Sequence, residues 1–485
     1  MDILNRSISK AKDRPVKILQ YGEGNFLRGF VDYMIDVANE KEVMSGSVVI
    51  VKAIEYGSLD SFYQQECQYT LSLRGIENGE AKAVNRIITS IADAVGAYEE
   101  YEKYAAYAKS DTLRFIVSNT TEAGIVFDET DIFEAKPPKT YPGKLTKFLF
   151  ERYQHYNGNP EKGLIIIPCE LIENNGGMLK QCVMRFAKLW NLEPGFQQWI
   201  ENSCIFSSTL VDRIVTGYPK EEAEAIYRQL GYYDALLDTA ELFGLWVIES
   251  EKSISDELPL DKAGLPVIFT DDQKPYRERK VRILNGAHTS FVLASFLAGN
   301  NYVLESMQDK DIRNFMTRTI FEEIIPTLSL PKEELVSFAN SVIERFENPY
   351  IKHALLSISL NSVSKWRSRC LPSFKEYVKR YGKLPKNLTF SLAALLCFYK
   401  SREYDNGTLT GYRGEQSYTI LDDRYVLEYF ANASILPNDE YVRSFICTDR
   451  FFGEDLSGYE GLADLVTEYI NQIEKHGMRK AIKLI

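Results

Sequence analysis

The chain of 485 residues is 45% hydrophobic and 26% charged, an ordinary globular composition that is sufficient for two or three domains with substantial cores. Its 57 basic and 68 acidic residues give a net charge of −11, which argues against a nucleic-acid partner and against binding to an anionic membrane surface. An anionic substrate is not excluded, because a local basic pocket can exist within an acidic protein.

Cysteine and histidine usage argues against a disulfide framework and against a metal site. The seven cysteines are scattered, odd in number and without C-x-x-C spacing, which indicates a reducing compartment. The four histidines, at positions 155, 288, 353 and 476, lack metal-ligand spacing, so no metal is expected. The first ten residues lack the apolar core of a signal peptide, and no run approaches about 18 apolar residues, so we expect a cytoplasmic protein without a membrane partner.

The N-terminal region predicts a strand, a glycine turn and a helix in succession. The strand is Val16–Tyr21, the turn contains Gly22 and Gly24, and a helical pattern runs from Phe30 to Ala38. This order places a pyrophosphate at a helix N-terminus, where glycines allow close approach of the backbone. The spacing is G-x-G-x-x-x-x-G and not G-x-G-x-x-G, so an ordinary strand-to-helix turn is the alternative.

The second predicted strand, within residues 47–55, bears on the choice of cofactor. In a dinucleotide-binding fold, an acidic residue near the end of this strand binds the ribose 2′-hydroxyl and favours NAD over NADP. Glu55 is the nearest candidate, whereas Lys52 points to NADP. This position leaves the choice open.

Later strands and helices alternate, which indicates a parallel, doubly wound sheet. The predicted strands are Leu113–Ser118, Leu164–Pro168, Ile205–Leu210 and Leu245–Glu249. Ligands of such sheets bind beyond the carboxyl ends of the strands, so the candidate binding segments are residues 118–124, 168–176 and 211–214. The alternative is that their Asn and Gly clusters are ordinary turns and that Asp212 and Arg213 form a structural ion pair.

A polar segment, 271–278, is the predicted linker between an N-terminal domain, residues 1–272, and a C-terminal domain, residues 273–485. From Asn301 onward the periodicity is helical, for example over Glu333–Phe346, Leu388–Tyr399 and Gly461–Lys475. The predicted fold is therefore α/β, with an N-terminal Rossmann-like doubly wound parallel sheet followed by a mostly α-helical domain.

The helix predicted from Lys280 to about Gly299 carries polar residues in an otherwise apolar run. At 100° per residue, Lys280, Asn285 and His288 lie within an arc of roughly 140°. A buried polar group without a partner costs about 1–3 kcal/mol, so these three need protein partners or a ligand. They are either satisfied core residues with a lysine reaching solvent, or a group that reduces a carbonyl by proton transfer and hydrogen bonding to the developing alkoxide.

The string Lys280-x4-Asn285-x2-His288 resembles the signature of the polyol-specific long-chain dehydrogenases, the mannitol dehydrogenase family, and the resemblance extends over essentially the whole chain. It implies that Lys280 is the general acid/base and that Asn285 and His288 polarise and orient the carbonyl. It also implies NAD as cofactor, with NADP not excluded, and chemistry that needs no metal.

The family's G-x-G-x-F-x-R opening is matched at the glycine turn, and the resemblance implies a cofactor site that also draws on the loops after the strands. Its residues are Gly22, Gly24, Asn25, Phe26, Arg28, Glu55, Asn119 and Thr120.

Two departures from mannitol-type members bear on the substrate. Where those members carry Cys-Asp-Asn, this chain has Cys169-Glu170-Leu171, so Asn175 or another donor must replace the lost asparagine. Ser357 stands where the family has a substrate-binding arginine, whereas Lys365 keeps the corresponding lysine. A run of basic residues is by itself usually a solvated face, but here we expect Arg367 or Arg369 to pair with a substrate carboxylate.

The resemblance therefore implies a small-molecule substrate, a ketouronate that is reduced reversibly to its aldonate. The expected substrate-binding residues are Asn175, Asp212, Lys365, Arg367 and Arg369. The alternatives are another ketouronate reductase or a polyol dehydrogenase of the same family, and a non-catalytic dinucleotide-binding sensor. The sequence does not fix the oligomeric state and is compatible with a monomer.

Overall fold

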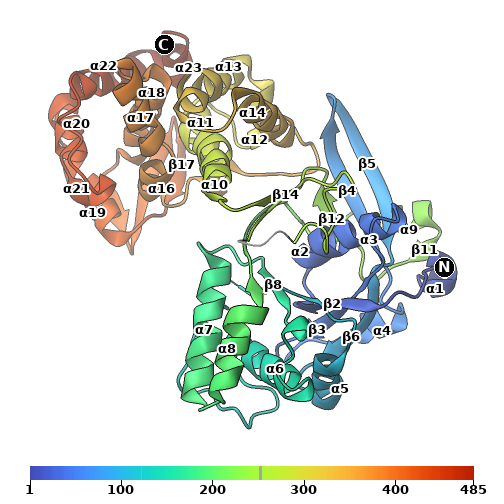
Figure 1. The fold of residues 1–485 in the computed structure, drawn as a ribbon. Helices are drawn as coiled ribbons and strands as arrows, with labels where there is room; N and C mark the ends of the chain where they lie inside the picture. The colour runs from blue at the N-terminus through green and yellow to red at the C-terminus, as the bar shows by residue number, and fades with distance from the viewer. Residues whose placement is uncertain (122, 251–253) are drawn as a thin grey trace. The chain divides into compact units, whose positions relative to one another are not determined.

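The computed structural model describes residues 1–121, 123–250 and 254–485, which form two compact units (Figure 1). Unit 1 comprises Met1–Gly75 and Lys82–Gln273, and unit 2 comprises Ile76–Ala81 and Lys274–Ile485. We retain residues 1–272 and 273–485 as the proposed functional domains.

Unit 1 is built around a parallel sheet of six strands in the order β6-β3-β2-β7-β8-β9. These strands are β2 (Val16–Tyr21), β3 (Ser47–Lys52), β6 (Ile91–Gly96), β7 (Phe115–Ser118), β8 (Ile165–Pro168) and β9 (Ile205–Phe206). From β2 the chain proceeds outward to β3 and β6, and it then returns to the other side of β2 to add β7, β8 and β9. This reversal between β2 and β7 confirms the predicted doubly wound sheet, and ligands of such sheets bind at the reversal point.

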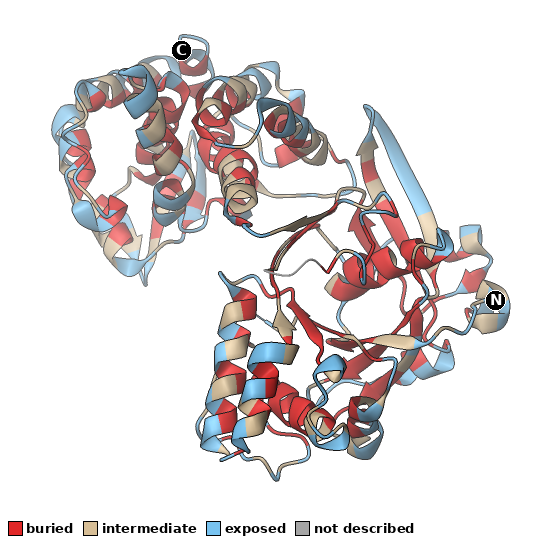
Figure 2. Ribbon diagram, in the orientation of Figure 1, coloured by how far each residue is buried: buried red, intermediate tan, exposed pale blue. Residues whose placement is uncertain are grey.

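The alternation of side chains along the strands produces two hydrophobic cores, one on each face of the sheet. Ile18, Val48 and Ile50 pack in the core that includes helix α3 (Tyr33–Glu40), while Leu19 and Val49 pack in the opposite core. The helices of that opposite core are α5 (Tyr101–Ala106), α6 (Tyr141–His155), α7 (Asn175–Leu189) and α8 (Pro194–Ser203). Figure 2 shows the strands of this sheet as buried.

Of the last two strands predicted in unit 1, one is divided in the structure, and the other is confirmed but lies outside the parallel sheet. The predicted strand Ile205–Leu210 is divided into β9, which ends the parallel sheet, and β10 (Ser208–Asp212), which starts another. The predicted strand Leu245–Glu249 is β13, but it pairs antiparallel with β10 and parallel with β14 (Val267–Thr270) in a separate sheet. An apolar run predicts a buried strand and does not identify its partner.

A second small sheet contains a long hairpin that the sequence analysis missed, and it belongs to unit 1 except for the hairpin tip, Ile76–Ala81, which is part of unit 2. Strands β4 (Tyr69–Glu77) and β5 (Glu80–Ile88) are joined by Asn78 and Gly79, which both have positive φ, at 54° and 81°. Asn-Gly between two strand-like runs is a strong hairpin signal, so the sequence did contain the information. The remaining strands of unit 1 are β1 (Asp2–Ile3), β11 (Tyr232–Tyr233) and β12 (Asp238–Glu241), and its short helices are α1 (Arg6–Ser9), α4 (Asp60–Gln64) and α9 (Ala223–Leu230).

Unit 2 is mostly helical, as predicted. The predicted helices 333–346, 388–399 and 461–475 are α14 (Lys332–Phe346), α18 (Lys386–Tyr399) and α22 (Leu462–His476). Helix α11 (Gly286–Leu297) is almost entirely buried and packs against α18. The other helices are α12 (Val303–Gln308), α13 (Lys310–Arg318), α15 (Leu355–Ile358), α16 (Ser362–Arg369), α17 (Leu371–Tyr381), α19 (Arg424–Ala433), α20 (Asn438–Ile446), α21 (Asp449–Phe452) and α23 (Met478–Ile482).

Unit 2 also corrects two expectations. The segment 271–278, predicted as a linker, is helical from Lys274, where α10 (Lys274–Arg279) begins. The strands β15 (Glu403–Asp405), β16 (Thr408–Arg413) and β17 (Gln416–Ile420) form a small antiparallel sheet within the region expected to be helical. Within the described ranges, no helix is both long enough and apolar enough to cross a bilayer.

Candidate active site

In unit 1, the glycine turn leaves space for a ligand at the start of a helix. Gly22 has φ of 123°, and a Cβ atom there would lie 3.2 Å from the carbonyl oxygen of Asn119. At Gly24 a Cβ would meet nothing within 4 Å, and no side chain caps the helix that begins with α2 (Asn25–Leu27) and continues to Glu40. Free N–H groups beside open space are the arrangement that receives a pyrophosphate.

Arg28, which the family pattern assigns to the cofactor site, is buried beneath this turn. Its guanidinium donates to Asn25 Oδ1 at 2.6 Å and to the Leu236 carbonyl at 2.5 Å, and it lies over the Tyr69 ring at 5.1 Å. Phe26 is half-buried and stacks on Phe30 with ring centroids 5.1 Å apart. This geometry indicates that Arg28 positions the exposed Asn25 and does not itself contact a ligand.

At the end of β3, the structure separates the roles of Glu55 and Lys52. Glu55 is exposed in the loop after the strand. The buried ammonium of Lys52 donates to the carbonyls of Ile54 and Tyr56 and pairs with Glu99 at 2.6 Å. Since the Lys52 ammonium is already bonded within this loop, it is not available to a 2′-phosphate, and this position favours NAD over NADP.

The turns after β7 and β8 are joined by Glu170, a residue of a candidate binding segment to which the sequence analysis gave no role of its own. Asn119 and Thr120 are half-buried in the first turn, and Asn119 Nδ2 donates to the Cys169 carbonyl at 2.8 Å. The Glu170 carboxylate is only 2% exposed and accepts hydrogen bonds from Ser118 and Thr120. Burial raises the pKa of this carboxyl, and the hydrogen bonds oppose the rise.

The structure does not support Asn175 as a substrate donor. Its side chain is fully buried, with Nδ2 donating to the carbonyls of Pro168, Glu170 and Thr209 and Oδ1 accepting from two backbone N–H groups. This amide therefore holds the start of α7 against β8 and β10 and has no free donor. Asp212 is buried at the end of β10, and the adjacent Arg213 donates to the carbonyls of Phe243, Gly29 and Leu242.

In unit 2, the three predicted catalytic residues lie on one continuous helical run that contains a π turn. The run consists of α10, the π turn η4 (Lys280–Asn285) and α11, and the N–H of Gly286 donates to the carbonyl of Val281 in the i→i+5 pattern of a π turn. A π turn holds more residues than an α turn, so Lys280 and Asn285 are closer to alignment than 100° per residue predicts. All three residues are half-buried.

His288 is held between aromatic rings in a positively charged environment. Its ring stacks on Phe346 with centroids 4.2 Å apart and meets His353 edge-on at 5.5 Å. Burial, followed by repulsion from His353, Arg345, Arg369 and Lys365, holds the pKa of His288 well below its ordinary value. The imidazole is therefore neutral at pH 7, and its Nε2 is buried without a hydrogen-bond partner within the described part of the chain.

The two candidate arginines of α16 lie on different faces of this helix. Lys365 and Arg369 are one turn apart and both act on His288, and Lys365 Nζ donates to the Ile358 carbonyl at 2.8 Å. Arg369 is half-buried, and it makes no hydrogen bond or ion pair to any residue in the described ranges. The sequence analysis gave no functional role to Arg345 or His353, because neither lies on the motif helix or on α16.

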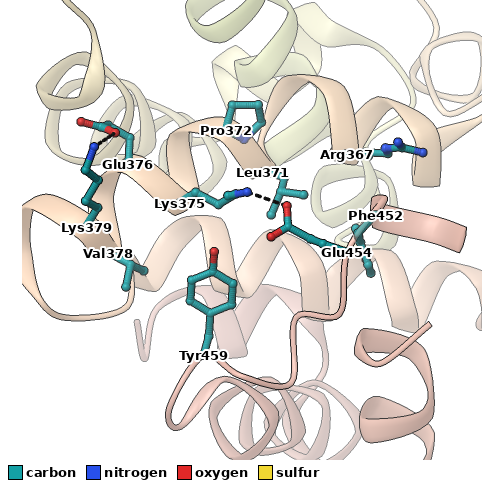
Figure 3. A pocket seen from close by; sticks show the side chains of 10 residues that line it. All are labelled: Arg367, Leu371, Pro372, Lys375, Glu376, Val378, Lys379, Phe452, Glu454 and Tyr459. Carbon is teal, nitrogen blue, oxygen red and sulfur yellow. Dashed lines mark hydrogen bonds and ion pairs between the residues drawn. The ribbon is translucent and has the colours of Figure 1, made fainter. Parts of the chain in front are cut away.

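Arg367 instead lines a separate open pocket of about 650 Å³ (Figure 3). The pocket also contains Leu371, Phe452 and Tyr459, together with the ion pair of Lys375 and Glu454 at 2.6 Å. Residues 367 and 369 are about 200° apart on a helical wheel, which explains the separation. The structure thus brings Arg369, and not Arg367, towards His288.

Among the described residues, no three His, Cys, Asp or Glu side chains lie close enough together to hold a metal ion.

Comparison with known proteins identifies the family of the whole chain. Residues 16–262 match the mannitol dehydrogenase Rossmann domain, and residues 272–473 match the mannitol dehydrogenase C-terminal domain. The chain belongs to the mannitol dehydrogenase family. It is an oxidoreductase, and the resemblance deduced from the Lys280 motif is confirmed.

Curated members of the family include relatives of nearly the same length. The altronate oxidoreductase of Yersinia enterocolitica serotype O:8 / biotype 1B is 44% identical over 489 residues, covering 99% of each chain. That of Enterobacter sp. (strain 638) is 44% identical over 490 residues, covering 100% of this chain and 99% of the relative.

Two solved structures share the fold over the full length at 21% identity. A D-sorbitol dehydrogenase in substrate-free form has a TM-score of 0.78 and covers 99% of this chain and 100% of its own. The mannitol 2-dehydrogenase of Pseudomonas fluorescens, in ternary complex with NAD and D-mannitol, has a TM-score of 0.66 and covers 100% and 99%.

Proposed function

We propose that this chain is a tagaturonate reductase, or altronate oxidoreductase, which interconverts D-tagaturonate and D-altronate with NAD(H). The 44% identity to altronate oxidoreductases over the full length supports this substrate. The observation that carries the proposal is the positive charge around His288, where Arg345, Arg369 and Lys365 surround a neutral imidazole. A neutral ketose offers no anionic group to Arg369, whereas a ketouronate supplies a carboxylate.

Arg369 is the residue that we assign to the substrate carboxylate. A guanidinium binds a carboxylate through two parallel hydrogen bonds, and that of Arg369 is half-buried with no partner among the described residues. Lys365 contributes a second positive charge on the same face of α16. We do not assign this role to Arg367, because it lines the other pocket.

The proposed chemistry assigns proton transfer to Lys280. In reduction, protonated Lys280 donates its proton to the carbonyl oxygen as negative charge develops there, and in oxidation neutral Lys280 accepts the proton of the hydroxyl group. Asn285 and neutral His288 donate hydrogen bonds to the same oxygen. Bound NADH supplies the hydride to the keto carbon.

We propose that the residues of the glycine turn bind the pyrophosphate of the cofactor and that Glu55 binds the ribose. Asn119 and Thr120 contact the half of the dinucleotide that carries the reactive ring. The uncapped helix start and the open space at Gly24 fit a pyrophosphate. The neutralised Lys52 and the exposed Glu55 fit NAD better than NADP, because a 2′-phosphate would meet a carboxylate.

A substrate panel tests the proposal. Oxidation of NADH and of NADPH is measured with tagaturonate, fructuronate and fructose, and we expect the highest kcat/KM with tagaturonate and NADH. Faster turnover of fructuronate or fructose would assign the chain to one of the alternative activities of the family. An absence of turnover with all three substrates would support the dinucleotide-binding sensor.

Lys280→Ala tests the assigned acid. We expect kcat to fall by about a hundredfold or more, the usual contribution of a general acid, while NADH still binds. Binding is measured by the change in NADH fluorescence on titration with protein. A kcat near that of the wild type would remove Lys280 from the mechanism.

A further inference from the structure

Glu170 occupies a place in unit 1 at which three loops of the candidate cofactor site meet. Strand β7 ends at Ser118 and β8 ends at Pro168, and these two residues are paired in the sheet. The turns after β7 and β8 therefore begin side by side at the carboxyl edge of the sheet. Both lie on the side of β2 that is opposite to β3. Because Glu55 and the ribose site belong to the β3 side, the β7 and β8 turns belong to the half of the dinucleotide that carries the reactive ring.

The Glu170 carboxylate fixes the β7 turn through three hydrogen bonds. Its Oε1 accepts from the N–H and from the Oγ1 of Thr120, both at 3.0 Å, and its Oε2 accepts from Ser118 Oγ at 3.1 Å. The side chain is 2% exposed and forms no ion pair within the described ranges. A buried carboxylate without a cation depends on such donors, so this carboxylate and the β7 turn hold each other in place.

The Ser118–Thr120 turn, fixed by Glu170, also limits the position of the glycine turn. The carbonyl oxygen of Asn119, between the two residues held by Glu170, is 3.2 Å from where a Cβ of Gly22 would be. The N–H of Asn119 donates to the Tyr21 carbonyl at 3.2 Å, and its Nδ2 donates to the Cys169 carbonyl at 2.8 Å. A displacement of residues 118–120 is thus transmitted to both neighbouring loops.

We propose that Glu170 is a positioning residue for the cofactor, which acts by locking the Ser118–Thr120 turn against the glycine turn. It touches no reacting atom itself. This inference rests on the proposed use of NAD(H).

Two substitutions separate hydrogen-bond geometry from charge. Glu170→Gln keeps one oxygen for both donors of Thr120 and can donate from its amide to Ser118 Oγ, so the lock persists without the charge. Glu170→Ala removes every acceptor. We expect the Kd of NADH to rise about tenfold or more in Glu170→Ala, because the Ser118–Thr120 turn then loses all three hydrogen bonds to the Glu170 side chain, and to stay within about threefold of wild type in Glu170→Gln.

Asp131 provides a matched control in the same unit. Its buried carboxylate accepts from the N–H and the Oγ1 of Thr140, both at 2.8 Å, and from the N–H of Lys139, but at the start of α6. We expect Asp131→Ala to lower the Tm about as much as Glu170→Ala and to leave the Kd of NADH unchanged. An equal rise of Kd in both variants would overturn the proposal, because the effect would then be general loosening of unit 1.

The measurements are made on the full-length protein with NADH as the probe, and KM for NADH and kcat are determined beside Kd. A loss in Glu170→Gln as large as in Glu170→Ala would also overturn the proposal, since charge would then matter more than geometry. If Glu170→Ala does not fold, Glu170→Asp, which is one methylene too short to reach Thr120, carries the same expected rise in Kd. Failure of the substrate panel would refute the proposed substrate and leave this Kd comparison intact.

Discussion

Arg367 and Arg369 are separated by a single residue on α16, yet their surroundings differ completely. Arg369 acts on His288 and is half-buried, whereas Arg367 is exposed and lines the pocket with Lys375 and Tyr459. One arginine is therefore a natural control for the other.

Arg369→Ala should raise the KM for tagaturonate by about tenfold to a hundredfold, because a charge-assisted hydrogen bond to a carboxylate contributes about 1.5–3 kcal/mol. Arg367→Ala should leave this KM within about twofold of wild type. Steady-state kinetics of both variants, with fructose as a neutral comparison substrate, provide the measurement. Equal KM values for the two variants would contradict the assignment of Arg369.

His288 gives a second prediction at the scale of one residue. Its pKa lies well below its ordinary value because of burial and of the surrounding cations, so the neutral form persists as the pH falls. The acid limb of kcat/KM should therefore not appear near pH 6.5, the ordinary pKa of histidine. In Arg369→Ala, which removes one repelling charge, the pKa of His288 should rise; NMR titration of the imidazole, assigned with His288→Gln, measures it. An unchanged pKa would place Arg369 too far away to act on His288.

At the scale of elements, the helical run α10–η4–α11 shows how close packing supports the site. A Cβ on Gly286 would lie 3.1 Å from the carbonyl oxygen of Arg369 and 3.5 Å from that of Val281. The Cys370 thiol also donates to the Gly286 carbonyl at 3.7 Å. The absence of a side chain at Gly286 therefore lets the end of α16, with Arg369, approach the residues after the π turn.

Gly286→Ala should raise the KM for tagaturonate several-fold with little change in Tm. Alanine stabilises a helix interior by about 0.5–1 kcal/mol relative to glycine, which offsets part of the cost of overpacking, about 1–3 kcal/mol, so the net loss of stability stays small if the overpacking is at the low end of that range. The displacement of α16 persists and moves Arg369. Gly458→Ala, where the added methyl meets nothing within 4 Å, is the control. The expectation fails if the two variants have the same KM.

The elements also show what could be predicted from the sequence. The strands at Val16–Tyr21 and Ser47–Lys52 and the α14, α18 and α22 helices were predictable, because periodicity of hydrophobic residues is local information. The division between β9 and β10 was not, since it depends on which strands become neighbours. The π turn was not predictable either, because one extra residue in a turn leaves no distinct trace in an apolar pattern. Glu170 lay within a predicted binding segment, but its partners, Ser118 and Thr120, are about 50 residues distant.

At the scale of the whole molecule, the stability of the chain should depend on a buried aspartate of unit 1. Asp32 is fully buried within the helix that follows the glycine turn, where Gln20 Nε2 donates to its Oδ2 at 3.2 Å and its Oδ1 has no partner among the described residues. Burial raises its pKa from 3.8 to about 7, and Arg28 opposes the rise only in part. The native state therefore holds a proton at pH 5 that the unfolded chain has released.

This difference in bound protons means that stability is highest below the unfolded pKa and falls as the pH rises from about 4 to 7, by roughly 1.4 kcal/mol per unit of pKa shift. Asp32→Asn is neutral at every pH and lacks this loss. We therefore subtract the Tm of wild type from that of Asp32→Asn at each pH. We expect this difference, measured by thermal unfolding, to be several degrees higher at pH 8 than at pH 5. The exposed Asp271→Asn should show no such change between the two pH values. If the Tm difference is instead the same at pH 5 and pH 8, Asp32 is already ionised in the native state at pH 5, and Arg28 compensates its charge.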